Sequence, residues 1–409
     1  MALIVVKFGG TSVADVKRIE TAAAKVAREV ARGNKVAVVV SAMAGVTNQL
    51  VEYCNQVDKL HDPSEYDVVV ASGEQVTSGL MAMTLRKMGI NARSWLGWQV
   101  PIITDAVHSK ARISEIKTEE LLKRLNAGEV AVIPGFQGVT EDGRVTTLGR
   151  GGSDTSAVAV AAALNADRCD IYTDVDGVYT TDPRIVPQAR KISRISYEEM
   201  LELASVGAKV LHIRSVEIAM KKDLSLQVLS SFEEHIGSDL PGTLVTREED
   251  IMEQQLVTGV AYTRDEAKVT LIGVPDVPGV AARIFSPLAE AAVNVDMIVQ
   301  NVSPDGKLTD ITFTVPRADL PRAIETIKKL SDMKFKEMQT SDAVAKISVV
   351  GVGMKSHSGV ANTMFKTLAD KGINIQVIST SEIKISVLID QDYVELAVRS
   401  LHAAYGLED

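Results

Sequence analysis

Residues 3–15 read LIVVKFGGTSVAD, and this stretch decides the fold. The continuous apolar run Leu3–Val6 predicts a strand that is buried on both faces, and a pair of glycines ends it. Ser12 and Asp15 resemble a capping box, so a helix is predicted to start just after them. Its apolar positions recur at helical spacing: Val16, Ile19, Ala23, Val26 and Val30.

The same order of strand, turn and helix continues along the first half of the chain. A second buried strand is predicted at Val36–Val40, and 138–147, with Glu-Asp-Gly at its centre, predicts a hairpin. Strands that alternate with helices indicate an α/β fold with a mostly parallel sheet covered on both faces. The further predicted helices lie near 47–60, 75–88, 118–126, 154–165 and 197–221, and the further strands near 90–96, 130–134, 169–173 and 225–230.

The last third of the chain contains an internal repeat. One copy, from Lys268, reads KVTLIGVPDVPGVAARIFSPLAEAAVNVDMI; the other, from Lys346, reads KISVVGVGMKSHSGVANTMFKTLADKGINIQVI. Each copy predicts a strand, a turn, a helix, two strands and a helix. The polar segment Thr246–Gln255 precedes the repeat and is interpreted as a linker or a solvated helix. The matched pairs are Gly279 with Gly359, Phe285 with Phe365, Leu288 with Leu368, and Asn294 with Asn374.

The two copies differ at their ends. The first continues into 334–339, which predicts a fourth strand, whereas the second ends after Gly406 without one. A sheet that lacks a strand has an exposed edge. Residues 256–263 have strand character and are predicted to fill that place, so that the two modules are entwined.

Composition restricts the classes of function. The 409 residues carry a formal net charge of −9, which argues against nucleic acid or anionic membranes as partners. The two cysteines, Cys54 and Cys169, have no metal or redox spacing and are expected to be reduced. There is no signal-peptide pattern and no apolar stretch long enough to span a bilayer, so a soluble, cytoplasmic protein is expected.

Two glycine-rich segments are candidates for anion binding. Lys7-Phe8-Gly9-Gly10 follows the first strand, and 149–156, GRGGSDTS, opens an alanine-rich helix. Helix N-termini and glycine turns at strand ends favour phosphate and carboxylate groups. Taken singly, each has a simpler interpretation: a tight turn with an exposed lysine, or an aspartate that caps a helix. Together they indicate a crevice that binds two anionic groups.

Three further segments add polar side chains to such a crevice. Ser41–Thr47 follows the second strand, and Ser72-Gly73-Glu74 opens a helix where an acid is usually only a dipole partner. The carboxylates in 172–184 follow a buried strand and either hold a nucleotide or form Asp-Gly and Asp-Pro turns. The histidines show no metal-ligand spacing, and no nucleophile–base motif or Walker loop occurs. The residues indicate a phosphate-binding enzyme that works by positioning and charge neutralisation.

The motifs KFGGTSV, SAMAGVT, ASGEQ, GFQG, TTLGRGGSDTSA, YTDVDGVYTTDPR and EEMLELASVGAKVLH are similar to those of the aspartate kinases, within the amino-acid kinase family. The similarity is greatest to the bacterial lysine- and threonine-regulated type and runs over the whole chain, and the repeat resembles a tandem pair of ACT modules. It implies a three-layer amino-acid kinase fold in 1–245 and a linker at 246–255. A first ferredoxin-like βαββαβ module would occupy 264–341, and 256–263 with 342–409 would form the second.

The resemblance also implies roles in phosphorylating the side chain of L-aspartate with ATP and Mg²⁺. Lys7 would stabilise the transferring phosphoryl group and Asp154 would organise the Lys7 contacts, so both catalytic side chains are expected to converge on the γ-phosphate. Magnesium would bridge the phosphates rather than occupy a protein cage. Aspartate would be held by Thr47, Glu74, Arg150, Gly151, Gly152 and Ser153. ATP would be held by Lys7, Phe8, Gly9, Gly10, Ser41, Thr173, Asp174, Tyr179, Asp182, Arg184, Lys209 and Val210.

The ACT modules would bind effectors, with lysine and threonine as candidates. By resemblance the chain forms a homodimer through these modules, or a tetramer with a shorter regulatory chain that starts internally near Met252. Candidate residues in the first module are Asp276, Pro278, Gly279, Asn294, Asp296, Gln300 and Asn301. Those in the second are Met354, Lys355, Ser356, His357, Ser358, Gly359, Val360, Asn374, Ile375, Ser381 and Glu382.

Two other functions compete with this interpretation. One is an amino-acid kinase that acts on glutamate, against which the paired ACT modules and the SGEQ stretch argue. The other is an amino-acid sensor without catalysis, against which intact Lys7, Arg150 and Asp154 argue.

Overall fold

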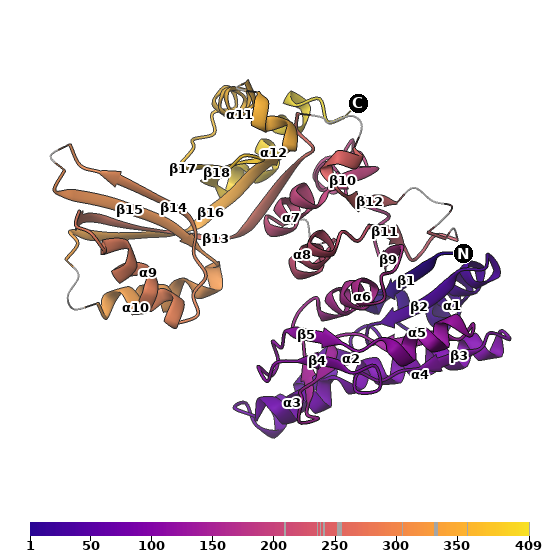
Figure 1. Ribbon diagram of the computed structural model, residues 1–409. Coiled ribbons are helices and arrows are strands. Elements are labelled where there is room, and N and C mark those ends of the chain that lie inside the picture. Colours follow the sequence, from indigo (N-terminus) through magenta and orange to yellow (C-terminus); the bar gives the residue numbers. More distant parts are fainter. Residues whose placement is uncertain are drawn as a thin grey trace. The chain divides into compact units, whose positions relative to one another are not determined.

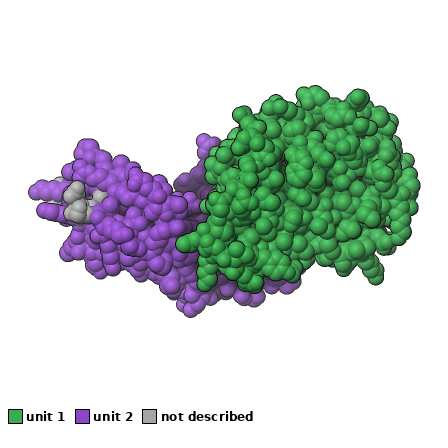
Figure 2. All heavy atoms as spheres, turned by 90° about the horizontal axis from the view of Figure 1, so that it is seen from below, with its two compact units in different colours: residues 1–178, 191–204, 209–252 green, residues 179–190, 205–208, 253–409 purple. Residues whose placement is uncertain are grey.

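The computed structural model describes residues 1–409 except 208–209, 235, 238, 240–241, 252–255, 305, 331–333, 358 and 409. The chain divides into two compact units, which Figure 2 distinguishes by colour. The first unit comprises 1–178, 191–204 and 209–252, and the second 179–190, 205–208 and 253–409. Part of the predicted linker, including Met252, lies outside the described residues.

An eight-stranded sheet forms the centre of the first unit, in the order β10-β12-β11-β9-β1-β2-β6-β3 (Figure 1). All neighbours pair in parallel except β11 and β12, so the predicted, mostly parallel sheet is confirmed. The strands are β1 (Leu3–Phe8), β2 (Lys35–Val40), β3 (Ala92–Ser94), β6 (Val130–Pro134), β9 (Arg168–Thr173), β10 (Arg194–Ser196), β11 (Leu226–Ser230) and β12 (Thr243–Thr246).

Helices cover both faces of this sheet. Alternate residues of β1 and β2 share one core with α1 and α4, while α6 packs on the opposite face of β1 and β9, next to α8. Burial on both faces explains why these strands read as continuous apolar runs. The helices are α1 (Val16–Ala31), α2 (Val46–Val57), α3 (Pro63–Val70), α4 (Ser72–Lys87), α5 (Glu119–Asn126), α6 (Gly152–Ala163), α7 (Tyr197–Ser205) and α8 (Ile213–Lys222).

A smaller sheet has the strand order β5-β4-β7-β8. The hairpin predicted at 138–147 is confirmed by the antiparallel pairing of β7 and β8. The other two strands were not predicted, because strands of three or four residues give little periodic signal. The four strands are β4 (Ile102–Thr104), β5 (Ile113–Ile116), β7 (Gln137–Val139) and β8 (Val145–Thr147).

Two local predictions were wrong, and the elements β10, β12 and α3 were not predicted. The N-cap of α1 is Asp15, which accepts from the Arg18 amide, whereas Ser12 lies in the 3-10 turn Gly10–Val13, so there is no capping box. Helix α3 was missed; it begins at Pro63, directly after a capping aspartate. The single helix predicted over 197–221 is two helices, because the backbone at Gly207 adopts a φ of 125° that a helix cannot contain.

The second unit is built on a six-stranded sheet in the order β14-β15-β13-β16-β18-β17 (Figure 1). Helices α9 and α10 share one core with β13 and β15, and α11 and α12 share another with β16 and β18. The strands are β13 (Gly259–Pro275), β14 (Asp296–Val302), β15 (Leu308–Val315), β16 (Glu337–Val350), β17 (Val377–Thr380) and β18 (Lys384–Asp390). The helices are α9 (Val280–Glu290), α10 (Leu320–Lys328), α11 (Gly359–Asp370) and α12 (Val394–Ala404). Short 3-10 turns lie at Glu248–Asp250, in the first unit, and at Arg317–Asp319, Val352–Ser356 and Gln391–Tyr393.

The two long strands, β13 and β16, each serve both halves of the repeat. Residues 259–263 of β13 pair with 346–350 of β16, and 268–272 of β13 pair with 337–341 of β16. The strand pairing predicted for 256–263 is therefore confirmed from Gly259 onward. The strand predicted at 334–339 begins only at Glu337 and runs on without a break into the second copy.

The segment 179–190 belongs to the second unit, although it follows β9 in the sequence. Ile185 and Val186 are part of the core that contains α11 and α12. The Thr180 hydroxyl lies 2.9 Å from the His402 Nε2. Across the part of the chain that the structure describes, no helix is both long enough and apolar enough to cross a membrane.

Candidate active site

Lys7 and Asp154, far apart in the sequence, meet at the carboxyl end of β1. Lys7 is near the end of that strand and is only 8% exposed. Asp154 is in the first turn of α6, which packs on β1. The Lys7 Nζ lies 2.6 Å from the Asp154 Oδ1. The structure therefore places an ammonium and a carboxylate together, with one of the glycine-rich segments beside each.

The Gly9–Gly10 turn leaves room close to the Lys7 ammonium. A Cβ at Gly9 would lie 3.3 Å from the Lys7 Nζ, and one at Gly10 would lie 3.1 Å from the Ala42 carbonyl oxygen. The Gly9 amide itself donates to the Tyr172 carbonyl. The turn therefore lets a ligand come close to the Lys7 ammonium, but it does not present a free Gly9 amide.

Phe8 was predicted to help bind nucleotide. Its side chain is fully buried and stacks on the Tyr172 ring, with 5.0 Å between the ring centroids. Only the backbone of Phe8 is therefore placed to serve a ligand at the end of the strand.

The second glycine-rich segment shapes the start of α6. Gly149 and Gly151 have left-handed φ angles of 77° and 69°. A Cβ at Gly151 would lie 2.3 Å from the His212 ring, so a larger residue does not fit there. Arg150, between the two glycines, is exposed, and the structure records no ion pair between it and a described residue. Its guanidinium is available to an anionic ligand.

Gly152 and Ser153, the next two residues, pack closely against the segment that follows β6. A Cβ at Gly152 would lie 2.8 Å from the Phe136 ring, and a Cβ at Gly135 would lie 2.8 Å from the Ser153 Cβ. Glycine at 135 and 152 thus lets the segment after β6 approach the start of α6 closely.

Glu74 is a buried carboxylate with one unused oxygen. It lies in the first turn of α4, is 3% exposed, and accepts from the Ala42 amide through Oε1 at 3.0 Å. Its Oε2 is buried and has no hydrogen-bond partner among the described residues. Burial raises the pKa of Glu74 to about 7. An ammonium group beside this carboxylate would stabilise its charged form.

Ser41 and Thr47 lie on the segment between β2 and α2. The Ser41 amide donates to the Phe8 carbonyl, which fixes this segment beside β1. Thr47 is the second residue of α2, which follows Gly45 with its left-handed φ of 83°. Both predicted residues are partly exposed.

The nucleotide residues predicted at the end of β9 contact a segment that sequence reasoning missed. The Thr173 hydroxyl donates to the Asp174 carboxylate, and the Thr173 carbonyl accepts from the amide and the hydroxyl of Ser231. Arg18 of α1 also donates to Ser231. No motif marked Ser231, because it follows β11 in an irregular stretch. Val210 is partly buried, and the predicted Lys209 lies outside the described residues.

Tyr179, Asp182 and Arg184, also predicted for the nucleotide, belong to the second unit. The Arg184 guanidinium pairs with the Asp182 carboxylate at 2.8 Å, and the Tyr262 hydroxyl donates to the same carboxylate at 3.1 Å. Hydrogen bonds from Arg184 hold the pKa of Asp182 below its usual value. Their role in nucleotide binding stays a prediction from the resemblance.

His212 was given no role by sequence reasoning. Its ring lies against Gly151, and burial lowers its pKa even though the Asp154 carboxylate acts in the opposite direction. The lowered pKa favours the neutral imidazole, which adds no positive charge next to the Lys7–Asp154 pair. Among the described residues, no group of three or more His, Cys, Asp or Glu side chains could hold a metal ion.

The effector residues predicted in the first module lie before α9, and in β14 or just before it. Gly279 caps α9 with a φ of 88°, and the Gln300 side chain donates to the Asp276 carboxylate at 3.3 Å. The Asp296 carboxylate is already engaged, because it lies 2.6 Å from the Lys346 Nζ. The remaining predicted residues, Pro278, Asn294 and Asn301, are exposed.

The effector residues predicted in the second module lie before α11 and in its first turn, and on either side of β17. The His357 Nδ1 lies 3.0 Å from the Gly353 carbonyl oxygen, and the Val360 carbonyl accepts from the Tyr405 hydroxyl. Ser358 lies outside the described residues, as do the side chains of Lys355 and Ser356. Gly359, Asn374, Ser381 and Glu382 are exposed, while Met354 and Ile375 are partly buried.

Comparison with known proteins agrees with this architecture. The model of the amino acid kinase family matches residues 2–230, and two ACT domain models match 268–332 and 347–405. An aspartokinase of Pseudomonas aeruginosa is 55% identical over 100% of this chain and 98% of its own length.

Solved structures are similar as well. The aspartokinase III of E. coli, in an R-state complex with aspartate and ADP, has a TM-score of 0.82 and 27% identity, over 98% of this chain and 99% of that one. A T-state complex of the same enzyme with lysine and aspartate has a TM-score of 0.75 at 27% identity, with the same coverage. The chain therefore belongs to the amino acid kinase family, and within it to the aspartokinases that carry two ACT domains.

Proposed function

We propose that this protein transfers the γ-phosphoryl group of ATP to the side-chain carboxylate of L-aspartate and forms 4-phospho-L-aspartate. The observation that supports this most strongly is the 2.6 Å contact between the Lys7 Nζ and the Asp154 Oδ1, between two glycine-rich segments. The aspartokinase of known structure that this chain resembles was solved with aspartate and ADP.

The chemistry assigned to these residues is positioning and charge neutralisation. A carboxylate oxygen of aspartate forms a bond to the γ-phosphorus, while the bond from that phosphorus to the β-phosphate oxygen breaks and ADP leaves. The Lys7 ammonium stabilises the negative charge on the transferring group, and Asp154 holds Lys7 in place. The glycine turn beside Lys7 admits the phosphate oxygens, with Thr173 and Asp174 on the nucleotide side.

Aspartate itself would bind through its two other charged groups. The exposed Arg150 guanidinium would donate hydrogen bonds to the α-carboxylate, with the backbone of Gly151, Gly152 and Ser153 beside it. The unused Oε2 of buried Glu74 would accept the ammonium group, assisted by Thr47. This pairing satisfies a buried oxygen that otherwise lacks a partner.

Mg²⁺ fits this site as a partner of the phosphates. Mg²⁺ is usually held by phosphate oxygens and water with few carboxylates, so the phosphates of bound ATP would supply most of its ligands. When bound, the ion would neutralise charge on the β- and γ-phosphates. Among the described protein side chains, Asp154 is the acid in contact with Lys7.

We further propose that amino-acid effectors, lysine, threonine or both, inhibit the enzyme at its ACT modules. The related aspartokinase III was solved with lysine in a T state, which supports lysine as one candidate. Effectors act only if they bind a less active arrangement more tightly. The reaction would then be the first, feedback-controlled step towards lysine, threonine and methionine.

The proposed domains are a catalytic domain at 1–245, a first ACT module at 264–341, and a second formed by 256–263 with 342–409. The shared strands β13 and β16 support the interleaved order of the modules. We propose assembly through the ACT modules, as a homodimer or as a tetramer with a shorter regulatory chain. The edge strands β14 and β17 support this, because they expose Ile298 and Ile378.

A coupled ATP-turnover assay tests the proposal. Turnover should require aspartate, should be much slower with glutamate, and should fall when lysine, threonine or both are added. Phosphorylation of glutamate in preference to aspartate would contradict the proposed substrate. Turnover that no amino acid alters would contradict only the proposed regulation.

A further inference from the structure

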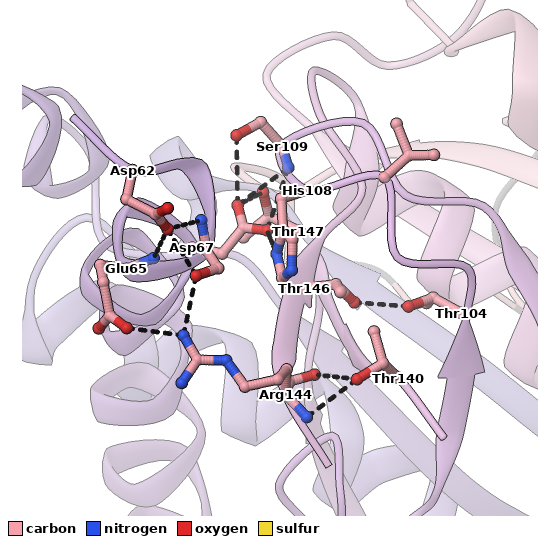
Figure 3. Close-up of polar contacts among 12 residues, drawn as sticks. Asp62, Glu65, Asp67, Thr104, His108, Ser109, Thr140, Arg144, Thr146 and Thr147 are labelled. Carbon is pink, nitrogen blue, oxygen red and sulfur yellow. Dashed lines mark hydrogen bonds and ion pairs between the residues drawn. The ribbon is translucent and has the colours of Figure 1, made fainter. Parts of the chain in front are cut away.

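The first unit contains a second buried carboxylate, Asp67, which lies outside the site described above. It is in α3, is 0% exposed, and accepts hydrogen bonds from three residues that are distant in sequence (Figure 3). The His108 Nδ1 lies 2.8 Å from Oδ2, the Ser109 amide lies 3.0 Å from Oδ2, and the Thr147 hydroxyl lies 2.6 Å from Oδ1. No Lys or Arg among the described residues pairs with Asp67.

The residues that bind Asp67 border the segment that carries Arg150. Thr147 is the last residue of β8 and is followed, after Leu148, by Gly149. Ser109 has a left-handed φ of 66°, which is uncommon for a residue with a side chain. Its carbonyl oxygen lies 3.1 Å from the position that a Cβ on Gly149 would occupy. The Asp67 carboxylate thus holds Ser109 in the conformation that packs its backbone on Gly149.

Further backbone contacts join the same two segments. The Ala111 amide donates to the Thr147 carbonyl. Arg214 donates to the Leu148 carbonyl at 2.7 Å and to the Ala111 carbonyl at 3.1 Å. The Gly152 amide closes the turn by donating to the Gly149 carbonyl. Contacts therefore run without a gap from Asp67 to the start of α6.

We propose that Asp67 is a positioning residue, which fixes the 149–152 turn so that Arg150 and the adjacent amides are set for the α-carboxylate of the substrate aspartate. Burying a carboxylate costs free energy, and an apolar side chain would serve packing alone. A carboxylate has the advantage that its hydrogen bonds are directional, so that one group orients an imidazole, an amide and a hydroxyl at once. When a group that positions the substrate is displaced by a small distance, substrate affinity and reaction rate both fall markedly. The kinetic part of this inference rests on the proposed function.

The test uses the full-length protein and three variants. Asp67→Asn places an amide nitrogen among hydrogen-bond donors, Thr147→Val removes the hydroxyl at nearly constant volume, and Thr147→Ser keeps it. We expect Asp67→Asn and Thr147→Val to raise the KM for aspartate about tenfold while the KM for ATP stays within about twofold. Thr147→Ser should keep both values close to those of the unaltered protein.

Hydrogen exchange gives a readout that does not depend on the reaction. Amides in 149–155 should exchange about tenfold faster in Asp67→Asn and Thr147→Val than in Thr147→Ser, with exchange in β1, β2 and β9 unchanged. A role in stability alone would instead lower kcat, leave both KM values unchanged and speed exchange throughout the unit.

The outcomes separate this inference from the proposed function. An unaltered protein that fails to turn over aspartate contradicts the function, and the exchange data then decide the role of Asp67. Unchanged exchange in 149–155 of Asp67→Asn, or an equal rise in both KM values, would overturn the inference.

Discussion

Two nearly buried lysines, one in each unit, differ in how many carboxylates surround them. Lys7 has one carboxylate contact, at 2.6 Å, and ends beside a glycine turn that leaves space. Lys346 contacts two, Glu266 at 2.8 Å and Asp296 at 2.6 Å, in the middle of a long strand. A lysine with one partner and room beside it can accept a phosphate, whereas one between two carboxylates is already neutralised.

Electrostatics around Lys346 support a structural role. Burial by itself lowers the pKa of Lys346, but Glu266 and Asp296 together outweigh it and hold the pKa above its ordinary value. Glu266 is on β13, Asp296 on β14 and Lys346 on β16. The cluster therefore joins strands from both copies of the repeat. We expect substitutions of Lys7 or Asp154 to reduce catalysis, and substitutions of Lys346 to reduce stability.

The largest effect is expected from Asp154→Asn. The change keeps the size of the side chain but removes the charge that holds Lys7, so kcat should fall about 10³-fold. Steady-state kinetics with aspartate measures it, and unfolding should show a nearly unchanged midpoint. Glu120→Gln, which alters an exposed pair with Arg124 on α5, serves as the matched control and should leave kcat unaltered. A kcat of Asp154→Asn close to that of the unaltered protein would contradict the role of Asp154.

Lys346→Met should produce the largest loss of stability. Glu266, which is 6% exposed, would remain as a buried charge without its partner, and the free energy of unfolding should fall by about 3–5 kcal/mol. Denaturant unfolding followed by circular dichroism measures the change.

The double variant Lys346→Met with Glu266→Leu is the control for this prediction. It removes both charges and should recover most of the lost stability. If the double variant is as unstable as Lys346→Met, the cost comes from packing and not from the unpaired charge.

Glu74 should make aspartate binding depend on pH. Its pKa of about 7 means that the carboxylate is charged above that pH and protonated below it. A protonated group does not pair with an ammonium group, so the KM for aspartate should rise up to about tenfold per pH unit below that pKa. Kinetics at pH values on both sides of the pKa tests this, and Glu74→Gln should show a raised KM without that slope.

The same raised pKa affects the stability of the free protein. Between pH 4.5, the ordinary value, and about 7, the folded protein keeps a proton that the unfolded chain has released, so stability falls as pH rises. Glu74→Gln should remove this part of the pH dependence. A slope that is the same in both proteins would show that Glu74 is not the titrating group.

The smallest effect is expected from Asp296→Asn. Burial acts to raise the pKa of Asp296, but Lys346 outweighs it and lowers the pKa, so the pair stabilises the fold above pH 3.8 and is lost as the pH falls below that value. The Asp296 side chain is 60% exposed, so solvent screening limits the loss at neutral pH to less than about 1 kcal/mol. A loss as large as that of Lys346→Met would show that Asp296, and not Glu266, is the main partner of Lys346.

Sequence patterns predicted most of the large sheet, because its strands are buried on both faces and read as apolar runs. They also indicated that 259–263 pair with the second copy, since a repeat that lacks a strand leaves an edge to fill. They missed β4, β5, β10, β12 and α3, and merged α7 with α8. Those elements are short, and the break between α7 and α8 depends on the backbone conformation at Gly207, which periodicity does not report.

The sequence by itself determined the family, the alternation of strands and helices, and the residue types of the site, because glycine turns, apolar runs and repeats are local patterns. The structure confirmed the predicted meeting of Lys7 and Asp154. Only the tertiary structure decided that Glu74 has a raised pKa and that Asp296 pairs with Lys346. The physical reason is that pairing, desolvation and hydrogen-bond saturation depend on neighbours in space. For these side chains the neighbours come from parts of the chain that no local pattern connects.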